Sequence, residues 1–320
     1  MEDRQGEGET GGKRAAAKRV RGNVNRVPAS PLRSWIRAIR PHHWAKNALV
    51  FVPAAAAHTL GDPAVLAASA LAFLAFCLVA SGTYLVNDIL DREFDRSHPT
   101  RRQRPIANGD ITIAAARTAA VFLVVTGFAV GYLGLGWPFL GVLGGYLFVT
   151  LWYSLQLKQR PVTDILCLAA LYTGRILAGS AATGIEPSFW LLAFSMLLFF
   201  SLAAAKRATE LAGLASRSEQ QAPGRGYTVG DLPLLVVFGV ASAYASVLLL
   251  ALYLNARADI LYTRPVLLWL LCPALLYWIS RIWLKTYRQE LHEDPVVFAL
   301  TDRPSIGVAL ICAALVWFAI

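Results

Sequence analysis

One amide and three carboxylates occur at helical spacing in the segment NDILDREFD, residues 87–95. Asp88, Asp91 and Asp95 are spaced i, i+3 and i+7, while Asn87, Asp91 and Asp95 are spaced i, i+4 and i+8, so either set follows one stripe of a helix. Carboxylates on one face repel each other unless a cation lies between them, and hard oxygen ligands suit Mg²⁺ bound to substrate phosphates. The spacing therefore predicts a Mg²⁺ site at these four residues.

A dense basic segment, SHPTRRQRPIANG at residues 97–109, follows directly. Its two prolines exclude one continuous helix, so we expect a loop that displays Arg101, Arg102 and Arg104. Guanidinium groups bind phosphate oxygens in a fork-like geometry, which would complete a metal–diphosphate site. The alternative is a solvated acidic helix end whose charges pair with neighbouring arginines. The position of the aspartates, at the end of an apolar helix and beside the basic run, favours the metal site.

The elements that must position these residues are apolar. The chain has 320 residues, 56% of them hydrophobic and 16% charged, whereas soluble domains carry about 25% charged residues. A membrane-spanning helix takes about 20 apolar residues, and the alternation typical of a β-barrel is absent. The sequence therefore predicts an all-α integral membrane protein. About nine spans are expected, at residues 45–60, 63–86, 112–133, 137–156, 162–183, 188–205, 232–254, 263–282 and 303–320.

Lysine and arginine are concentrated in the loops after the second, fourth, sixth and eighth predicted spans, and the opposite loops carry only Arg257 and Arg264. The positive-inside rule places the basic side in the cytoplasm, with the N-terminus. This distribution accounts for the net charge of +10 without a nucleic-acid partner. Residues 1–30 are predicted to be a disordered basic cytoplasmic tail near anionic membrane lipids. Residues 31–320 are predicted to form one multi-pass domain in the cell membrane, which begins with a short interfacial helix at 32–43.

Arg175 lies in an apolar run, eleven residues after Asp164. It could reach an interface by extending its side chain, but its position is near mid-depth of the predicted span. An unpaired arginine at that depth is costly, which makes Arg175 a candidate functional residue. Asp164, about three turns away on the same helix, is its candidate partner.

NDILDREFD followed by RRQRPIANG resembles the first aspartate motif of the UbiA superfamily of intramembrane prenyltransferases, NDxxDxxxD and then RP(I/L)AxG. RPHHWAKN, residues 40–47, is similar to the segment at which helix one of that family begins, and it adds Lys46 to the candidate binding residues. The resemblance covers residues 33–320. It implies a UbiA-like bundle with a central cavity open to the cytoplasmic side, and Mg²⁺ as cofactor.

The sequence departs from the family at one motif. Members that use a prenyl diphosphate as electrophile carry a second aspartate motif after the sixth helix, where this chain offers Lys206, Arg207 and Glu210. The combination of YSLQLKQRPVTD, RILAG and KRATEL is similar to one branch, the polyprenyl-phosphate phosphoribosyltransferases of the decaprenyl-phosphate type. That resemblance implies transfer of 5-phosphoribosyl from phosphoribosyl pyrophosphate to a polyprenyl phosphate, with release of pyrophosphate, for cell-wall precursor synthesis.

The resemblance also implies roles for the candidate residues. Mg²⁺ on the aspartate motif would hold the pyrophosphate, and Lys158, Lys206 and Arg207 would position the 5-phosphate or the lipid phosphate. An anionic nucleophile needs no general base, so the five histidines are expected to be interfacial. The predicted substrate-binding residues are Lys46, Arg101, Arg102, Arg104, Tyr153, Lys158, Asp164, Arg175, Lys206, Arg207 and Glu210.

Two alternatives remain open from the sequence. A prenyltransferase with an aromatic acceptor, of the quinone or haem pathway, would use tyrosine and tryptophan to stabilise an allylic cation. A transporter of anionic lipids would show internal repeats or helices broken at mid-membrane, neither of which is evident in the sequence.

Overall fold

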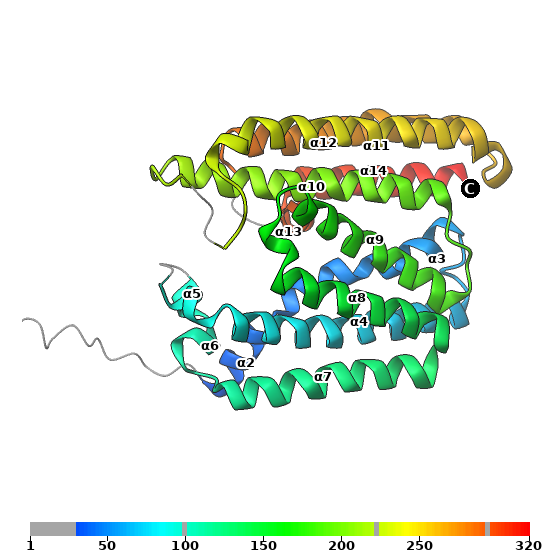
Figure 1. Ribbon diagram of the computed structural model, residues 1–320. Coiled ribbons are helices and arrows are strands. Elements are labelled where there is room, and N and C mark those ends of the chain that lie inside the picture. The colour runs from blue at the N-terminus through cyan, green and yellow to red at the C-terminus, as the bar shows by residue number, and fades with distance from the viewer. Residues whose placement is uncertain (1–29, 98–100, 221–223, 292–294) are drawn as a thin grey trace, which may run out of the picture.

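The computed structural model describes residues 30–97, 101–220, 224–291 and 295–320, and within this part the chain is a bundle of helices without strands (Figure 1). Residues 1–29 of the predicted tail lie outside the described residues. Seven helices are long and apolar enough to cross a membrane, so the chain is a multi-pass membrane protein. They are α4 (Pro63–Leu90), α7 (Ile113–Gly134), α8 (Trp137–Leu155), α9 (Thr163–Thr183), α10 (Phe189–Ala215), α11 (Leu232–Leu261) and α12 (Leu271–Tyr287) with the preceding 3₁₀ helix η5 (Pro265–Leu270).

Two of the nine predicted spans have a different form. Residues 45–60 fall on a 3₁₀ helix, η1 (Pro41–Phe51), and a short helix, α3 (Val52–Ala56). The last apolar run forms α14 (Arg303–Ala319), which at 17 residues is shorter than the seven. The described residues therefore contain seven helices of spanning length and not nine.

The segment η1 packs tightly against α4 and α9. Gly179 of α9 makes this possible, because a Cβ atom at that position would lie 2.0 Å from the backbone oxygen of Val50. Before η1, helix α2 (Pro31–Ile39) forms over most of the predicted interfacial helix and begins at a Ser30 cap. Arg40 then turns the chain with φ 53°. The N-terminal segment thereby enters the centre of the bundle.

Several short elements lie at one end of the bundle, at the left of Figure 1. Helix α4 ends at Leu90, and after Asp91 the chain continues as α5 (Arg92–Ser97), η2 (Arg101–Gln103) and α6 (Pro105–Asn108). Two more 3₁₀ turns are η3 (Leu157–Gln159), between α8 and α9, and η4 (Val229–Asp231), before α11. Helix α13 (Pro295–Thr301) contacts η1, α10 and α14.

Candidate active site

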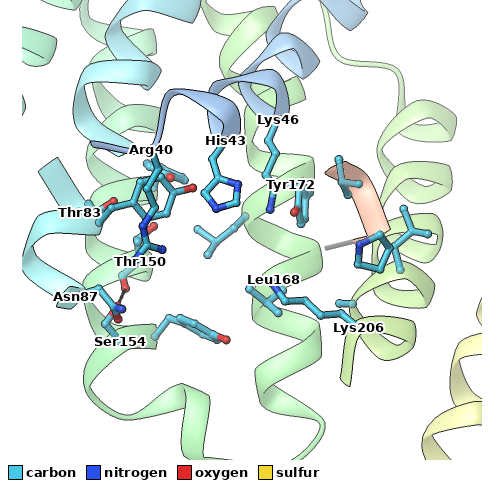
Figure 2. Close-up of a pocket in the computed structure, with 18 of the residues that line it drawn as sticks. Arg40, His43, Lys46, Thr83, Asn87, Thr150, Ser154, Leu168, Tyr172 and Lys206 are labelled. Carbon is cyan, nitrogen blue, oxygen red and sulfur yellow. Dashed lines mark hydrogen bonds between the residues drawn. The ribbon is translucent and has the colours of Figure 1, made fainter. Parts of the chain in front are cut away.

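A cavity of about 350 Å³ lies between η1, α4, α8, α9, α10 and α13 (Figure 2). Among its described lining residues only two are carboxylates, Asp91 and Glu210. Seven are cationic, so the cavity suits a ligand with several negative charges. The cationic residues are Arg40, Lys46, Arg101, Arg104, Arg175, Lys206 and Arg225.

Asn87 and Asp91 face this cavity from the end of α4. The side-chain amide nitrogen of Asn87 donates to Oδ2 of Asp91 at 3.1 Å. Lys158, from η3, donates to the other carboxylate oxygen at 2.7 Å and does not itself line the cavity. Asp91 is thereby held by both neighbours with its carboxylate at the cavity wall.

Asp88 and Asp95 are buried away from the cavity and bind arginines. Asp88 pairs with Arg40 at 2.6 Å and with Arg104 at 3.2 Å, and Asp95 pairs with Arg104 at 2.6 Å. Burial raises the pKa of Asp95, although the guanidinium of Arg104 acts in the opposite direction. The predicted four-residue stripe is therefore divided into two pairs, because the regular helix ends at Leu90 and Arg104 returns between Asp88 and Asp95.

The pair that faces the cavity fits Mg²⁺. No group of three or more histidine, cysteine, aspartate or glutamate side chains that could hold a metal occurs among the described residues. Mg²⁺ does not require such a cage, since it is usually bound by one or two carboxylates together with substrate phosphates and water. The amide oxygen of Asn87 and the carboxylate of Asp91, one turn apart, match that pattern.

A second set of charged residues surrounds Asp164 at the start of α9. Tyr153 donates its hydroxyl to Asp164 at 2.7 Å, and Arg207 pairs with the same carboxylate at 2.8 Å. Arg207 also pairs with Glu210. Arg225 reaches Tyr153 at 3.2 Å, Asp164 at 3.4 Å and Glu210 at 3.5 Å. The pKa of Arg225 is raised: burial lowers it, but Tyr153, Glu210 and Asp164 outweigh that effect.

The neighbours Lys206 and Arg207 have different surroundings in this structure. Lys206 lines the cavity, whereas Arg207 does not and is 0% exposed. Adjacent residues point about 100° apart on a helix of 3.6 residues per turn, so one helix position faces the cavity and the next faces the bundle interior. The geometry assigns Arg207 to positioning Glu210 and Asp164 and not to direct contact with a ligand in the cavity.

Arg175 lines the cavity and is 5% exposed. Its Nε donates to the side-chain oxygen of Asn47 at 2.9 Å, and its Nη2 donates to the Tyr146 hydroxyl at 3.2 Å. The predicted pairing of Arg175 with Asp164 is wrong, because Asp164 is bound by Arg207 and Arg225.

Three tyrosine rings at the cavity have cations over their faces. Arg175 lies 5.0 Å from the ring centre of Tyr146 and 5.4 Å from that of Tyr172. Lys46 lies 5.5 Å from the Tyr172 ring centre. The third ring, Tyr84, has the Arg40 guanidinium at 5.2 Å. These faces are therefore already engaged by positive charge.

The remaining predicted residues divide between the cavity and the surface. Arg101 and Arg104 line the cavity, whereas Arg102 is exposed and does not. Arg225 and Tyr84 also line the cavity and were not predicted. In the sequence, Arg225 looks like any basic residue of a loop, and Tyr84 looks like any aromatic residue of a membrane helix.

The segment RPHHWAKN contributes two further residues to the cavity wall. Arg40 and His43 line the cavity, a position that was not predicted for either residue. Their membership of RPHHWAKN was the signal that could have identified both. His98 and His292 lie outside the described residues.

Comparisons with known proteins identify relatives of this chain. The UbiA prenyltransferase family matches residues 48–303. The uncharacterized protein y4nM of Sinorhizobium fredii is 40% identical over 290 residues, which cover 89% of this chain and 56% of y4nM. This chain thus spans little more than half the length of y4nM. The nodulation protein NoeC of Azorhizobium caulinodans is 34% identical over 283 residues, covering 88% of this chain and 90% of NoeC.

An enzyme and a solved structure extend the comparison. The decaprenyl-phosphate phosphoribosyltransferase of Mycobacterium tuberculosis is 39% identical over 195 residues, covering 59% of this chain and 63% of that enzyme. A UbiA homologue from Archaeoglobus fulgidus, solved with GPP and Mg²⁺, superposes with a TM-score of 0.65 at 16% identity, covering 88% of this chain and 99% of that one. This likeness shows the shared fold.

Proposed function

Because the chain belongs to the UbiA prenyltransferase family, we propose that it is a Mg²⁺-dependent transferase that moves 5-phosphoribosyl from phosphoribosyl pyrophosphate to a polyprenyl phosphate. The acceptor would be of the decaprenyl-phosphate type, and the product a cell-wall precursor. Similarity to the Mycobacterium tuberculosis enzyme supports this proposal. The observation that carries it is the excess of cations in the cavity, seven against two carboxylates.

The charges of the two candidate substrate pairs differ. A prenyl diphosphate and an aromatic acid bring a diphosphate and a carboxylate, whereas phosphoribosyl pyrophosphate and a lipid phosphate bring a diphosphate and two monophosphates. Glu210, where a second aspartate motif would lie, is engaged by Arg207 and Arg225. One end of the cavity, at Asn87 and Asp91, therefore fits a metal-bound diphosphate, and the other cations fit monophosphates.

The reaction needs no proton transfer. The bond between C1 of ribose and the pyrophosphate oxygen breaks, its electron pair leaves with pyrophosphate, and a lipid phosphate oxygen forms the new bond to C1 from the opposite face. When bound, Mg²⁺ would offset the charge that develops on the departing pyrophosphate. Arg101 and Arg104 would bind the same oxygens, with Arg104 oriented by Asp95 and Asp88.

A prenyltransferase with an aromatic acceptor is the second candidate. The homologue solved with GPP and the tyrosines around the cavity favour it. However, the faces of Tyr84, Tyr146 and Tyr172 already carry cations. An allylic cation would meet like charges there, so phosphoribosyl transfer is favoured. A transporter is disfavoured because the chain belongs to a transferase family and because α4 and α10, which carry Asn87 and Lys206, run unbroken for 28 and 27 residues.

We also propose that the Asn87 end of the cavity and the N-terminus face the cytoplasm, in the cell membrane. A reporter fused after Ala107 or Arg217 should then give a cytoplasmic signal, and one fused after Asp62 or Glu186 should give the opposite signal. Alkaline phosphatase and green fluorescent protein fusions measure the two sides. A cytoplasmic signal at Glu186 would contradict this orientation.

The proposed activity has a direct assay in the purified protein. Release of pyrophosphate from phosphoribosyl pyrophosphate should require both Mg²⁺ and added polyprenyl phosphate. Polyprenol of the same length, which lacks the phosphate nucleophile, should give no release. Release with polyprenol, or no release with the phosphorylated lipid, would contradict the proposal.

A further inference from the structure

The cavity has two chemically different ends. Figure 2 shows Asn87 on one side and Lys46 and Lys206 on the other, with the two lysines arising from η1 and α10. The first α13 residues, Pro295 and Val296, also line the cavity, and α13 contacts both η1 and α10. Two ammonium groups therefore border the side of the cavity where an apolar helix forms the wall.

A second cavity, of about 960 Å³ and almost entirely apolar, lies between α3, α10, α12 and α14. Helix α13 lines it through Ala299, one turn after Pro295. Residues four apart lie on the same face of a helix, so one face of α13 borders both cavities.

One stripe of α10 connects the same two cavities. Phe194 and Leu198 line the apolar cavity, while Leu202, Lys206 and Glu210 line the polar one. These positions repeat every four residues and form a single helical stripe. From Lys206 to Phe194 the stripe extends about 18 Å, at 1.5 Å per residue. The side chains along that length are apolar, and Lys206 lies at the end that borders the polar cavity.

We propose that Lys46 and Lys206 hold the phosphate of the acceptor lipid and that its tail follows the α10 and α13 faces into the apolar cavity. This inference rests on the proposed function and assigns its acceptor subsite. A soluble sugar phosphate would gain nothing from the apolar stripe, whereas a polyprenyl phosphate matches both the charge and the surface that continues from it. Lysine ammonium groups suit a monophosphate as flexible point charges.

The subsite can be tested by binding, without turnover. The dissociation constants of decaprenyl phosphate and of phosphoribosyl pyrophosphate with Mg²⁺ are measured separately on the purified full chain by microscale thermophoresis. Lys46→Ala and Lys206→Ala should each weaken binding of the lipid by about ten- to a hundredfold, as loss of a charge-assisted hydrogen bond would. Binding of phosphoribosyl pyrophosphate should change by less than about twofold. Arg217→Ala, which removes an exposed charge just beyond α10, is the matched control.

The tail path has its own test. Ala299→Trp fills the face of α13 that leads into the apolar cavity. It should weaken binding of decaprenyl phosphate about tenfold and leave binding of the five-carbon dimethylallyl phosphate unchanged. Ala129→Trp, at an exposed position on α7, controls for the added ring.

The outcomes separate the inference from the proposed function. If the lysine variants weaken binding of phosphoribosyl pyrophosphate and not of the lipid, the subsite is overturned while phosphoribosyl transfer stands. Equal losses for the long and the short lipid in Ala299→Trp would overturn the tail path. Wild-type protein that does not bind phosphoribosyl pyrophosphate would overturn the proposed function and, with it, the assignment of an acceptor.

Discussion

Asp91→Asn should lower turnover roughly a hundredfold and raise the Mg²⁺ concentration that gives half-maximal activity. The substitution keeps the size of the side chain and removes the only carboxylate that faces the cavity at the Asn87 end, among the described residues. Lys158, which donates to Asp91, would also lose its ionic partner. Pyrophosphate release measured across a Mg²⁺ titration checks both effects.

Asp95→Asn is the informative comparison, because Asp95 is buried and bound to Arg104. Its loss should raise the KM for phosphoribosyl pyrophosphate, since Arg104 loses one of the two carboxylates that orient it. The Mg²⁺ concentration for half-maximal activity should change by less than about twofold. A shift as large as that of Asp91→Asn would instead support the predicted four-residue metal site.

Asp164→Ala should lower the free energy of unfolding by about 3 kcal/mol, the lower end of the usual cost of breaking a buried ion pair, because Arg207 keeps its pair with Glu210. Asp164 and Arg207 are both 0% exposed and pair at 2.8 Å. Arg207→Ala should cost a similar amount, and the double variant should lose less than the sum of the two single losses. Unfolding in detergent, followed by circular dichroism, measures all three.

Lys206→Ala supplies the contrast within the same helix. Lys206 lines the cavity, so its loss should leave the Tm within a few degrees of the wild type and reduce activity. The sequence alone predicts phosphate binding by Lys206 and Arg207 together. An Arg207→Ala protein with normal stability and weakened phosphate binding would restore that prediction and contradict the positioning role.

The spanning helices are largely evident from the sequence because apolar runs of sufficient length have few other stable forms in a membrane. Seven of the predicted runs form such helices. Composition does not distinguish an α-helix from a 3₁₀ helix, however, and the form of η1 depends on contacts with α4 and α9. The approach of Val50 to Gly179 is a contact between residues far apart in the chain.

The candidate site is only partly evident for a related reason. Helical spacing correctly brings Asn87 and Asp91 to one face. Extending the same stripe to Asp95 fails, because the regular helix ends at Leu90 and Arg104 returns from the following loop to bind Asp88 and Asp95. The pairing of these charges depends on where the chain folds back on itself. The periodicity of the local sequence does not predict that.

The central claim is the identity of the transferred group. Purified protein in liposomes receives two differently radiolabelled donors together, phosphoribosyl pyrophosphate and a prenyl diphosphate, with polyprenyl phosphate, an aromatic acid and Mg²⁺. We expect that the ribose label enters the lipid extract, that the prenyl label stays in its donor, and that Asp91→Asn lowers the transfer roughly a hundredfold. Prenylation of the aromatic acid, with phosphoribosyl pyrophosphate unconsumed, would contradict it.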